Sequence, residues 1–291
     1  MKNINFLKLE LIPVCLFAGF SLWWVLLHTI FIEDENKLEL FSATYGSLAL
    51  VGSIWGMYVS TLWNGWRSYI GKFLILFSLG LLFQEFGQIS YSYYTYIKGI
   101  EIPYPSLGDI GYFGSIPLYI TGIWFLLKSI SPKKSLNRKT IVPVIIIPIA
   151  MLIFSYFEFL QGYEFDWANP LVVFLDFGYP FGQAIYISIA ILSFILSGKY
   201  LGGRLKTPVM IILAALVCQY IADFTFLYQV SRETWTTAGI NDYMYLFSYF
   251  VMTLGLIQFN NVLEKLKVGE PKPVQVENVS VPIQNSEVTV Q

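Results

Sequence analysis

The residues of this chain best suited to chemistry are a few ionisable side chains placed inside long apolar stretches. Glu85, Asp176 and Asp223 lie in three such stretches, and His28, the single histidine, lies in a fourth. Ionisable groups are costly inside a bilayer and tend to mark binding or proton-transfer sites. No Lys or Arg lies in the interior of these stretches. We therefore expect each acid to be protonated, solvated by a cavity, or matched by a bound cation or donor ligand.

Helical spacing places polar residues of these stretches on stripes. The stripes are Gln84 with Gln88, Gln219 with Asp223, and Asp176 with Tyr179 and Gln183. Residues at such intervals share one helix face, and a polar face in a membrane must meet a neighbouring helix or water rather than lipid. The spacing predicts one ligand-binding site, which comprises Glu85, Gln88, Asp176, Tyr179, Gln183, Gln219 and Asp223. The alternative is that these residues form hydrogen bonds between helices and only hold the bundle together.

Three more residues are secondary candidates for this site: His28, Asp109 and Asp242. Each aspartate stands at the start of an apolar stretch, where a carboxylate satisfies free backbone N–H groups and the positive end of a helix. A plain helix cap is therefore the competing interpretation for both. For His28, in a stretch rich in Trp and Leu, the competing interpretation is a single hydrogen-bonded side chain.

The composition requires that these stretches cross a membrane. Of the 291 residues, 56% are hydrophobic and 13% are charged, against roughly 25% charged in an ordinary soluble domain. One core of this size could not bury so many apolar side chains, so they need lipid as their solvent. A net charge of −1 leaves no basic excess for a nucleic acid.

Eight apolar runs are long enough to span a bilayer. They cover residues 11–32, 41–63, 72–94, 109–128, 140–157, 170–198, 207–229 and 242–261. Glu85 lies about nine residues, roughly 13 Å, from one end of its run, and Asp176 and Asp223 lie about six residues, roughly 9 Å, from theirs. We therefore expect an all-α bundle of eight transmembrane helices, with the acids at similar depth in its outer half.

The distribution of basic residues predicts the orientation of the spans. Only Lys37, Lys98 and Arg232 fall in the segments expected outside, which leaves 15 of the 18 Lys and Arg residues for the cytoplasmic side. The outside segments instead hold the acidic residues of 33–35 and 158–166. Because basic residues stay inside, we expect a multi-pass protein of the plasma membrane with both termini in the cytoplasm. Residues 1–262 would form the membrane domain and 263–291 a disordered cytoplasmic tail.

An internal repeat relates the third and fourth spans to the seventh and eighth. Residues 82–88 align with 217–223, which places Gln84 over Gln219, and Asp109 aligns with Asp242 in the following span. In the same register Tyr112 and Gly122 lie over Tyr245 and Gly255. Both copies run in the same direction, and parallel repeats build pseudo-symmetric bundles with a binding site between the halves.

Several kinds of chemistry are excluded by residue counts. One histidine rules out multi-histidine zinc sites and bis-histidine haem ligation. The two cysteines, Cys15 and Cys218, both fall inside predicted spans and cannot form a disulfide framework. No lysine lies in the interior of a span, so a retinal Schiff base has no attachment point. Hydrolase and phosphate-loop motifs are missing. We expect no cofactor; the sequence leaves open whether the site binds a metal.

Short motifs of the chain resemble a known membrane module. They are 105–109 (Pro-Ser-Leu-Gly-Asp), 179–183 (Tyr-Pro-Phe-Gly-Gln) and 222–223 (Ala-Asp). Residues 71–261 resemble the multi-spanning N-terminal sensor region of bacterial diguanylate cyclase and phosphodiesterase (GGDEF/EAL) proteins. Gln88 and Gln183 stand where that family pattern has Asp, and Ser115-Ile116-Pro117 replaces a Tyr-Pro pair. The output domain of those proteins is missing, so the resemblance implies a signal passed to a separate partner.

Three functions remain open on this evidence. The first is a sensor-like or ligand-binding protein, more an interaction protein than an enzyme, whose outer-half pocket takes a small molecule, a lipid headgroup or a cation. The second is a proton- or cation-coupled transporter, suggested by the unpaired acids and the parallel repeat. The third is an intramembrane lipid hydrolase, in which paired carboxylates activate water. A closed inner half would favour sensing, a cavity continuous to the cytoplasm would favour transport, and two carboxyl groups that share a water would favour hydrolysis.

Overall fold

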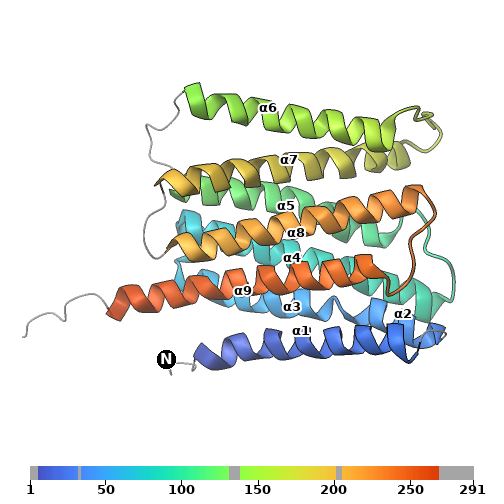
Figure 1. The fold of residues 1–291 in the computed structure, drawn as a ribbon, viewed down its shortest axis with the longest axis horizontal. Coiled ribbons are helices and arrows are strands. Elements are labelled where there is room, and N and C mark those ends of the chain that lie inside the picture. The colour runs from blue at the N-terminus through green and yellow to red at the C-terminus, as the bar shows by residue number, and fades with distance from the viewer. Residues whose placement is uncertain (1–5, 32–33, 131–137, 201–204, 269–291) are drawn as a thin grey trace, which may run out of the picture.

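The computed structural model describes residues 6–31, 34–130, 138–200 and 205–268, and all their regular structure is helical (Figure 1). The helices are α1 (Phe6–Thr29), α2 (Glu35–Thr44), α3 (Ser47–Leu62), α4 (Tyr69–Ser92), α5 (Leu107–Ile130), α6 (Arg138–Ser155), α7 (Pro170–Tyr200), α8 (Lys206–Ser231) and α9 (Ile240–Val268). A short 3₁₀ turn, η1 (Gly65–Arg67), precedes α4, and π-helical turns, η2 (Tyr93–Lys98) and η3 (Tyr156–Leu160), follow α4 and α6. The all-helical class expected from the sequence is confirmed for this part of the chain.

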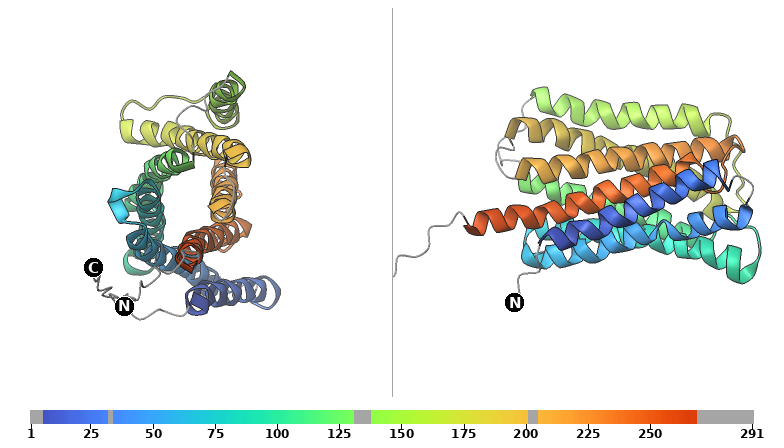
Figure 2. Two further views of the ribbon diagram at one scale, coloured as in Figure 1. Left: turned by 90° about the vertical axis from the view of Figure 1, so that its left-hand side faces the viewer. Right: turned by 60° about the horizontal axis from the view of Figure 1, so that its bottom comes forward.

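Six helices form a closed ring. In the cyclic order α3, α4, α5, α7, α8 and α9, each helix packs against the next, and α9 packs back against α3. The view along the helix axes shows this ring, with α1 and α6 outside it (Figure 2). α1 packs mainly on α9, and α6 packs on α7. The interior of the ring is filled by side chains, among which Tyr119, Tyr186 and Tyr249 are fully buried.

Seven helical segments within the described residues are long and apolar enough to cross a membrane. α2 and α3 together make one of them, Glu35–Leu62. The predicted span 140–157 is the one that falls short, because the apolar part of its helix that could be searched is confined to Ile145–Leu160. α9 ends at Val268, beyond the predicted boundary at residue 262. The rest of the predicted tail, residues 269–291, lies outside the described residues.

The two ends of the bundle differ in charge. One end, called here the acidic end, comprises residues 99–106, 161–169 and 232–239 (Figure 1, right). Its acidic residues include Asp166 and the neighbouring Glu158. The opposite end, called here the basic end, carries Arg67, Lys72 and Lys128. The first described residue of α1 and the last of α9 both lie at the basic end (Figure 1).

The ring interior changes character along its length. Near the basic end, buried apolar side chains fill it: Val59, Phe73, Phe77, Ile123, Leu126, Ile212, Leu256 and Phe259. Toward the acidic end, the buried side chains include Gln84, Glu85, Gln88, Gln219, Asp223 and Asp242. These buried acids and glutamines thus gather in one half of the bundle.

The predicted second span is not one continuous helix. α2 ends at Thr44 and α3 begins at Ser47, with Tyr45 and Gly46 as the link. The α2 carbonyls of Ser42 and Ala43 accept hydrogen bonds from α4 side chains. These side chains take the place of the backbone N–H groups that a continuous helix would supply.

Candidate functional site

Asp223 on α8 is the centre of a largely buried hydrogen-bond cluster. Its Oδ2 accepts from the hydroxyl of Tyr186 on α7 at 2.6 Å, and its Oδ1 accepts from the hydroxyl of Tyr245 on α9 at 3.0 Å. Gln219, one turn away, donates from Nε2 to Oδ1 at 3.0 Å and accepts at Oε1 from Ser248 at 2.9 Å. Three donors on three helices therefore stabilise this carboxylate, and its acceptor positions face protein groups.

A second cluster joins α2, α4, α5 and α9. Gln88 on α4 accepts from the hydroxyl of Tyr112 at 2.9 Å and donates to the carbonyl of Ser42. The hydroxyl of Ser42 donates to Oδ2 of Asp242 at 2.6 Å. Asp242 also accepts from the backbone N–H of Ala238 at 3.0 Å. Asp242 therefore ties the start of α9 to α2.

Gln84 on α4 connects its helix to both α5 and α9. Its Nε2 donates to the hydroxyl of Ser115 on α5 at 2.8 Å, and its Oε1 accepts from Tyr249 on α9 at 3.0 Å. Because Tyr249 also stacks on Tyr45 and Tyr245, aromatic rings fill the space between the two clusters.

Asp176 and Asp109 lie nearer the acidic end. Asp176 on α7 is half-buried, and its two oxygens accept from the hydroxyls of Tyr104 and Tyr163, each at 2.7 Å. The hydrogen bond to Asp176, together with burial, raises the pKa of Tyr163 to about 12. Burial and the same carboxylate raise the pKa of Tyr104. Both tyrosines therefore remain protonated donors at neutral pH, and Asp176 remains bonded to them.

Asp109 and Asp242 are not the N-cap residues that the sequence suggested. Each lies inside the first turn and accepts from a backbone N–H that precedes its helix: Ser106 for Asp109 at 2.7 Å, and Ala238 for Asp242. For Asp109 this is the reciprocal arrangement of a capping box, with Ser106 as the cap. Tyr179 on α7 adds a hydrogen bond to Asp109 at 2.7 Å. Both aspartates therefore also bind a side chain of another helix.

Glu85 is the exception among these acids. It is 9% exposed, and its Oε2 is buried without a hydrogen-bond partner. It lies on α4 between Gln84 and Gln88, and its carboxyl group packs against Gly46 of the α2–α3 link. The four aspartates described above each accept at least two hydrogen bonds from protein donors. Among these five described acids, Glu85 is therefore the one whose oxygen is left free to bind a proton or a ligand.

The structure brings most of the predicted residues together but separates others. Gln219 and Asp223 share one cluster, Gln88 and Asp242 share the next, and Tyr179 binds Asp109. Asp176 bonds to tyrosines of two connecting segments instead of the central clusters, and Gln183 is buried at 5% exposure. His28 is exposed on α1, outside the ring, and its Nδ1 lies 2.9 Å from the carbonyl oxygen of Trp24. His28 therefore lies apart from these clusters, because α1 packs outside the ring, and its role as a site residue stays a prediction.

Sequence reasoning missed the hydroxyl donors that hold these carboxylates. They are Ser42, Tyr104, Tyr163 and Tyr186, with Ser115, Ser248 and Tyr249 as partners of the glutamines. The repeat singled out Tyr112 and Tyr245, which both donate to residues of the predicted site. For Ser42 the sequence carries no signal, because a serine in an apolar helix commonly bonds to its own backbone.

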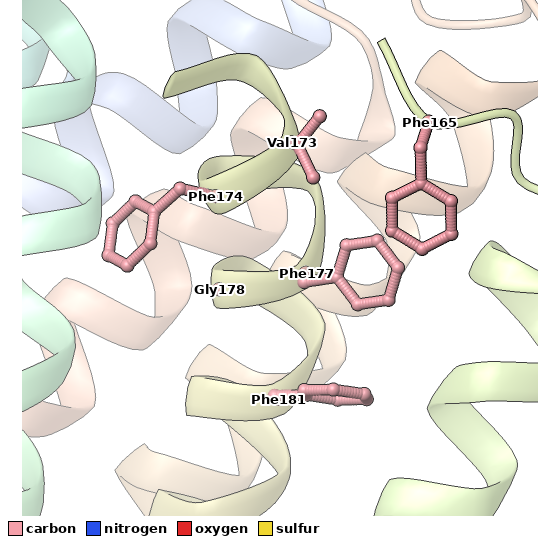
Figure 3. Close-up of a pocket in the computed structure, with 6 residues that line it drawn as sticks. All are labelled: Phe165, Val173, Phe174, Phe177, Gly178 and Phe181. Carbon is pink, nitrogen blue, oxygen red and sulfur yellow. The ribbon is translucent and has the colours of Figure 1, made fainter. Parts of the chain in front are cut away.

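An aromatic groove lies apart from the polar clusters, along the first turns of α7 and the connecting segment that precedes it (Figure 3). It measures about 370 Å³ and is lined by Phe165, Val173, Phe174, Phe177, Gly178 and Phe181. The lining is wholly apolar. None of these side chains takes part in the hydrogen bonds described above, so the groove is separate from the acidic site.

No cluster of three or more metal-ligating His, Cys, Asp or Glu side chains occurs within the described residues. The arrangement is instead that of buried carboxylates held by hydroxyl and amide donors. Comparison of the chain with models of protein families, with curated proteins and with solved structures gives no match.

Proposed function

We propose that this chain is a sensor-like, ligand-binding membrane protein whose site surrounds Glu85 in the half of the ring nearer the acidic end. The observation that carries the proposal is the buried Oε2 of Glu85, which has no hydrogen-bond partner. The surrounding clusters join five of the six ring helices with α2. Binding of a ligand at Glu85 would therefore alter the packing of several helices at once, as a sensor requires.

Packing of the other half favours sensing over the two alternatives. Fully buried side chains such as Phe73, Phe77 and Phe259 fill the ring toward the basic end. A transporter would need an aqueous route through this region. A hydrolase would need two carboxyl groups around one water, whereas no two of the aspartates described above share a hydrogen-bond donor.

The proposal includes eight membrane spans, with α6 as the eighth, and a parallel repeat of the two halves. Three pairs of hydrogen bonds support the repeat. Gln84 binds Ser115 as Gln219 binds Ser248, Tyr112 donates to Gln88 as Tyr245 donates to Asp223, and Asp109 and Asp242 each accept from a hydroxyl of another helix. α4 with α5 and α8 with α9 are also the most closely packed helix pairs.

The proposed orientation places the acidic end outside the cell and both termini in the cytoplasm, in the plasma membrane. The excess of Lys and Arg at the other end supports it. The resemblance of residues 71–261 to the membrane sensor regions of GGDEF/EAL proteins supports the proposed sensor function. We propose that this region passes its signal to a cytoplasmic or membrane signalling partner.

Cysteine labelling tests the orientation. Single cysteines at Asn36, Glu164 and Thr237 are expected to react with an impermeant thiol reagent in intact cells, because these residues belong to the acidic end. A cysteine at Trp66, which is exposed near the basic end, is expected to react only after the cells are opened. The unsubstituted chain controls for Cys15 and Cys218. Labelling of the Trp66 position from outside would reverse the proposed topology.

Thermal unfolding of the full chain in lipid nanodiscs tests the function. The probes are protons (pH 5 against pH 8), Na⁺, Ca²⁺ and methylammonium, followed by tryptophan fluorescence. At least one probe is expected to shift the midpoint by several degrees, on the order of 1 kcal/mol of differential binding. Glu85→Gln should abolish that shift, and Glu101→Gln, in an exposed connecting segment, should retain it. Flux of the same ions through proteoliposomes, above that of empty liposomes, would instead establish a transporter.

A further inference from the structure

The α2–α3 link is held against α4 by a stripe of three polar side chains: Glu85, Gln88 and Ser92. The hydroxyl of Ser92 donates to the carbonyl of Ala43 at 3.2 Å, and Nε2 of Gln88 donates to the carbonyl of Ser42. These two donors satisfy carbonyl oxygens near the end of α2. Two of the three stripe residues thus fasten α2 to the ring.

Glu85, the third residue of the stripe, meets the link at Gly46. A Cβ atom on Gly46 would collide with Oε2 of Glu85 and would lie 2.8 Å from Cγ of Gln88. The carboxyl group therefore occupies the space that the missing side chain leaves. No room remains there for an ammonium group or for a metal ion with its ligand shell, whereas a proton needs none.

The charged and titratable groups around Glu85 offer no positive partner. Tyr112 of α5 and Tyr249 of α9 are close enough to feel its charge, and Tyr45 precedes Gly46 in the link. The other charged groups on elements packed against α4 are Asp34, Glu35, Lys37 and Glu39 of α2 and its cap, Asp109 and Lys128 of α5, Lys98 of η2 and Arg67 of η1. Lys128 lies at the basic end, over the ring of Trp124. Lys37 is paired with Asp34 at 2.6 Å, Lys98 lies over the ring of Tyr93, and Arg67 is at the basic end.

We propose that Glu85 is a proton-binding site that controls the docking of α2 on α4. The proposal rests on the proposed function and names its ligand as the proton. When Glu85 loses its proton to water, the carboxylate is left buried without a donor, which is strongly unfavourable. Water reaches the buried Oε2 only if the link moves away from α4. The docked state is therefore favoured while Glu85 is protonated, and docking weakens as the pH rises through its pKa.

Hydrogen exchange of residues 35–46, measured by mass spectrometry on the full chain in nanodiscs, tests this proposal. After correction for the intrinsic effect of pH on exchange, protection in the wild type is expected to fall about tenfold per pH unit above the transition, because one proton is released. Glu85→Gln mimics the protonated acid and should keep α2 protected at every pH. Gly46→Ala fills the space of the carboxyl group and should leave α2 unprotected at every pH.

Two controls make the outcome decisive. Gly19→Ala, at a position where a Cβ meets nothing within 4 Å, and Glu101→Gln should both retain the wild-type pH profile. A wild-type profile without a transition, or a transition that persists in Glu85→Gln, would overturn the proposal; if Gly46→Ala does not fold, the Glu85→Gln profile decides. A Glu85-dependent transition in α2 combined with unchanged exchange at the basic end would keep the proton site and remove the sensor function.

Discussion

Replacing Asp223 with alanine is expected to lower the free energy of unfolding by about 3 kcal/mol or more, because three buried donors lose their acceptor at once. These donors are the hydroxyls of Tyr186 and Tyr245 and the amide of Gln219. Each belongs to a fully buried or mostly buried side chain in the centre of the ring. Without the carboxylate, they can be satisfied only if water enters the ring or the helices shift.

Asp223→Asn is the matched variant for this prediction. Asparagine keeps one acceptor oxygen and the shape of the side chain, and a tyrosine hydroxyl can accept from its amide group. We therefore expect a loss of less than half that of alanine, measured as chemical unfolding of the full chain in mixed micelles. Equal stability of the alanine variant and the wild type would show that Asp223 does not hold α7, α8 and α9 together.

Gly111→Ala is expected to destabilise the protein by about 3 kcal/mol, the upper end of the usual range for overpacking. A Cβ at this position on α5 would collide with the carbonyl oxygen of Phe83 and the backbone of Gly87 on α4. Because both obstacles are backbone atoms, no side-chain rotation relieves the collision, and α4 and α5 must separate. Small residues at such contacts let membrane helices approach closely.

Gly19→Ala provides the control for this second prediction. Gly19 lies on α1 with no atom near the added Cβ, so the change should leave stability within a few tenths of a kcal/mol or raise it slightly through helix propensity. The difference between the two variants isolates the α4–α5 contact from the general effect of a glycine replacement. If Gly111→Ala unfolds at the same denaturant concentration as the wild type, the close approach of α4 and α5 is wrong.

Stability and recognition draw on the same polar residues in this fold. Asp223 and Asp242 are held by donors from neighbouring helices, so their replacement should act mainly on folding. Glu85 has no such donors, and Glu85→Gln should change the response to protons while preserving the fold. The contrast separates acids that build the ring from the acid that is proposed to respond.

Sequence alone is sufficient for the class of the protein and for the depth of its polar groups. Long apolar runs with few charges indicate helices that suit lipid, because hydropathy and length act locally. The spacing of Gln219 with Asp223 likewise places both on one helix face, and the structure joins them by a hydrogen bond. The interruption at Tyr45 and Gly46 was not expected, because it depends on α4 side chains that bind the α2 carbonyls.

Tertiary structure decided which residue each polar face meets. Helical periodicity defines the face and the depth of a side chain on its own helix, but the partner depends on which helices become neighbours in the ring. Asp176 therefore bonds to Tyr104 and Tyr163 of connecting segments, and Asp223 bonds to Tyr186 and Tyr245. Oε2 of Glu85 remains without a donor because the α2–α3 link, which it faces, presents Gly46. These pairings join residues far apart in the chain, and only the closed packing of six helices brings them within hydrogen-bond distance.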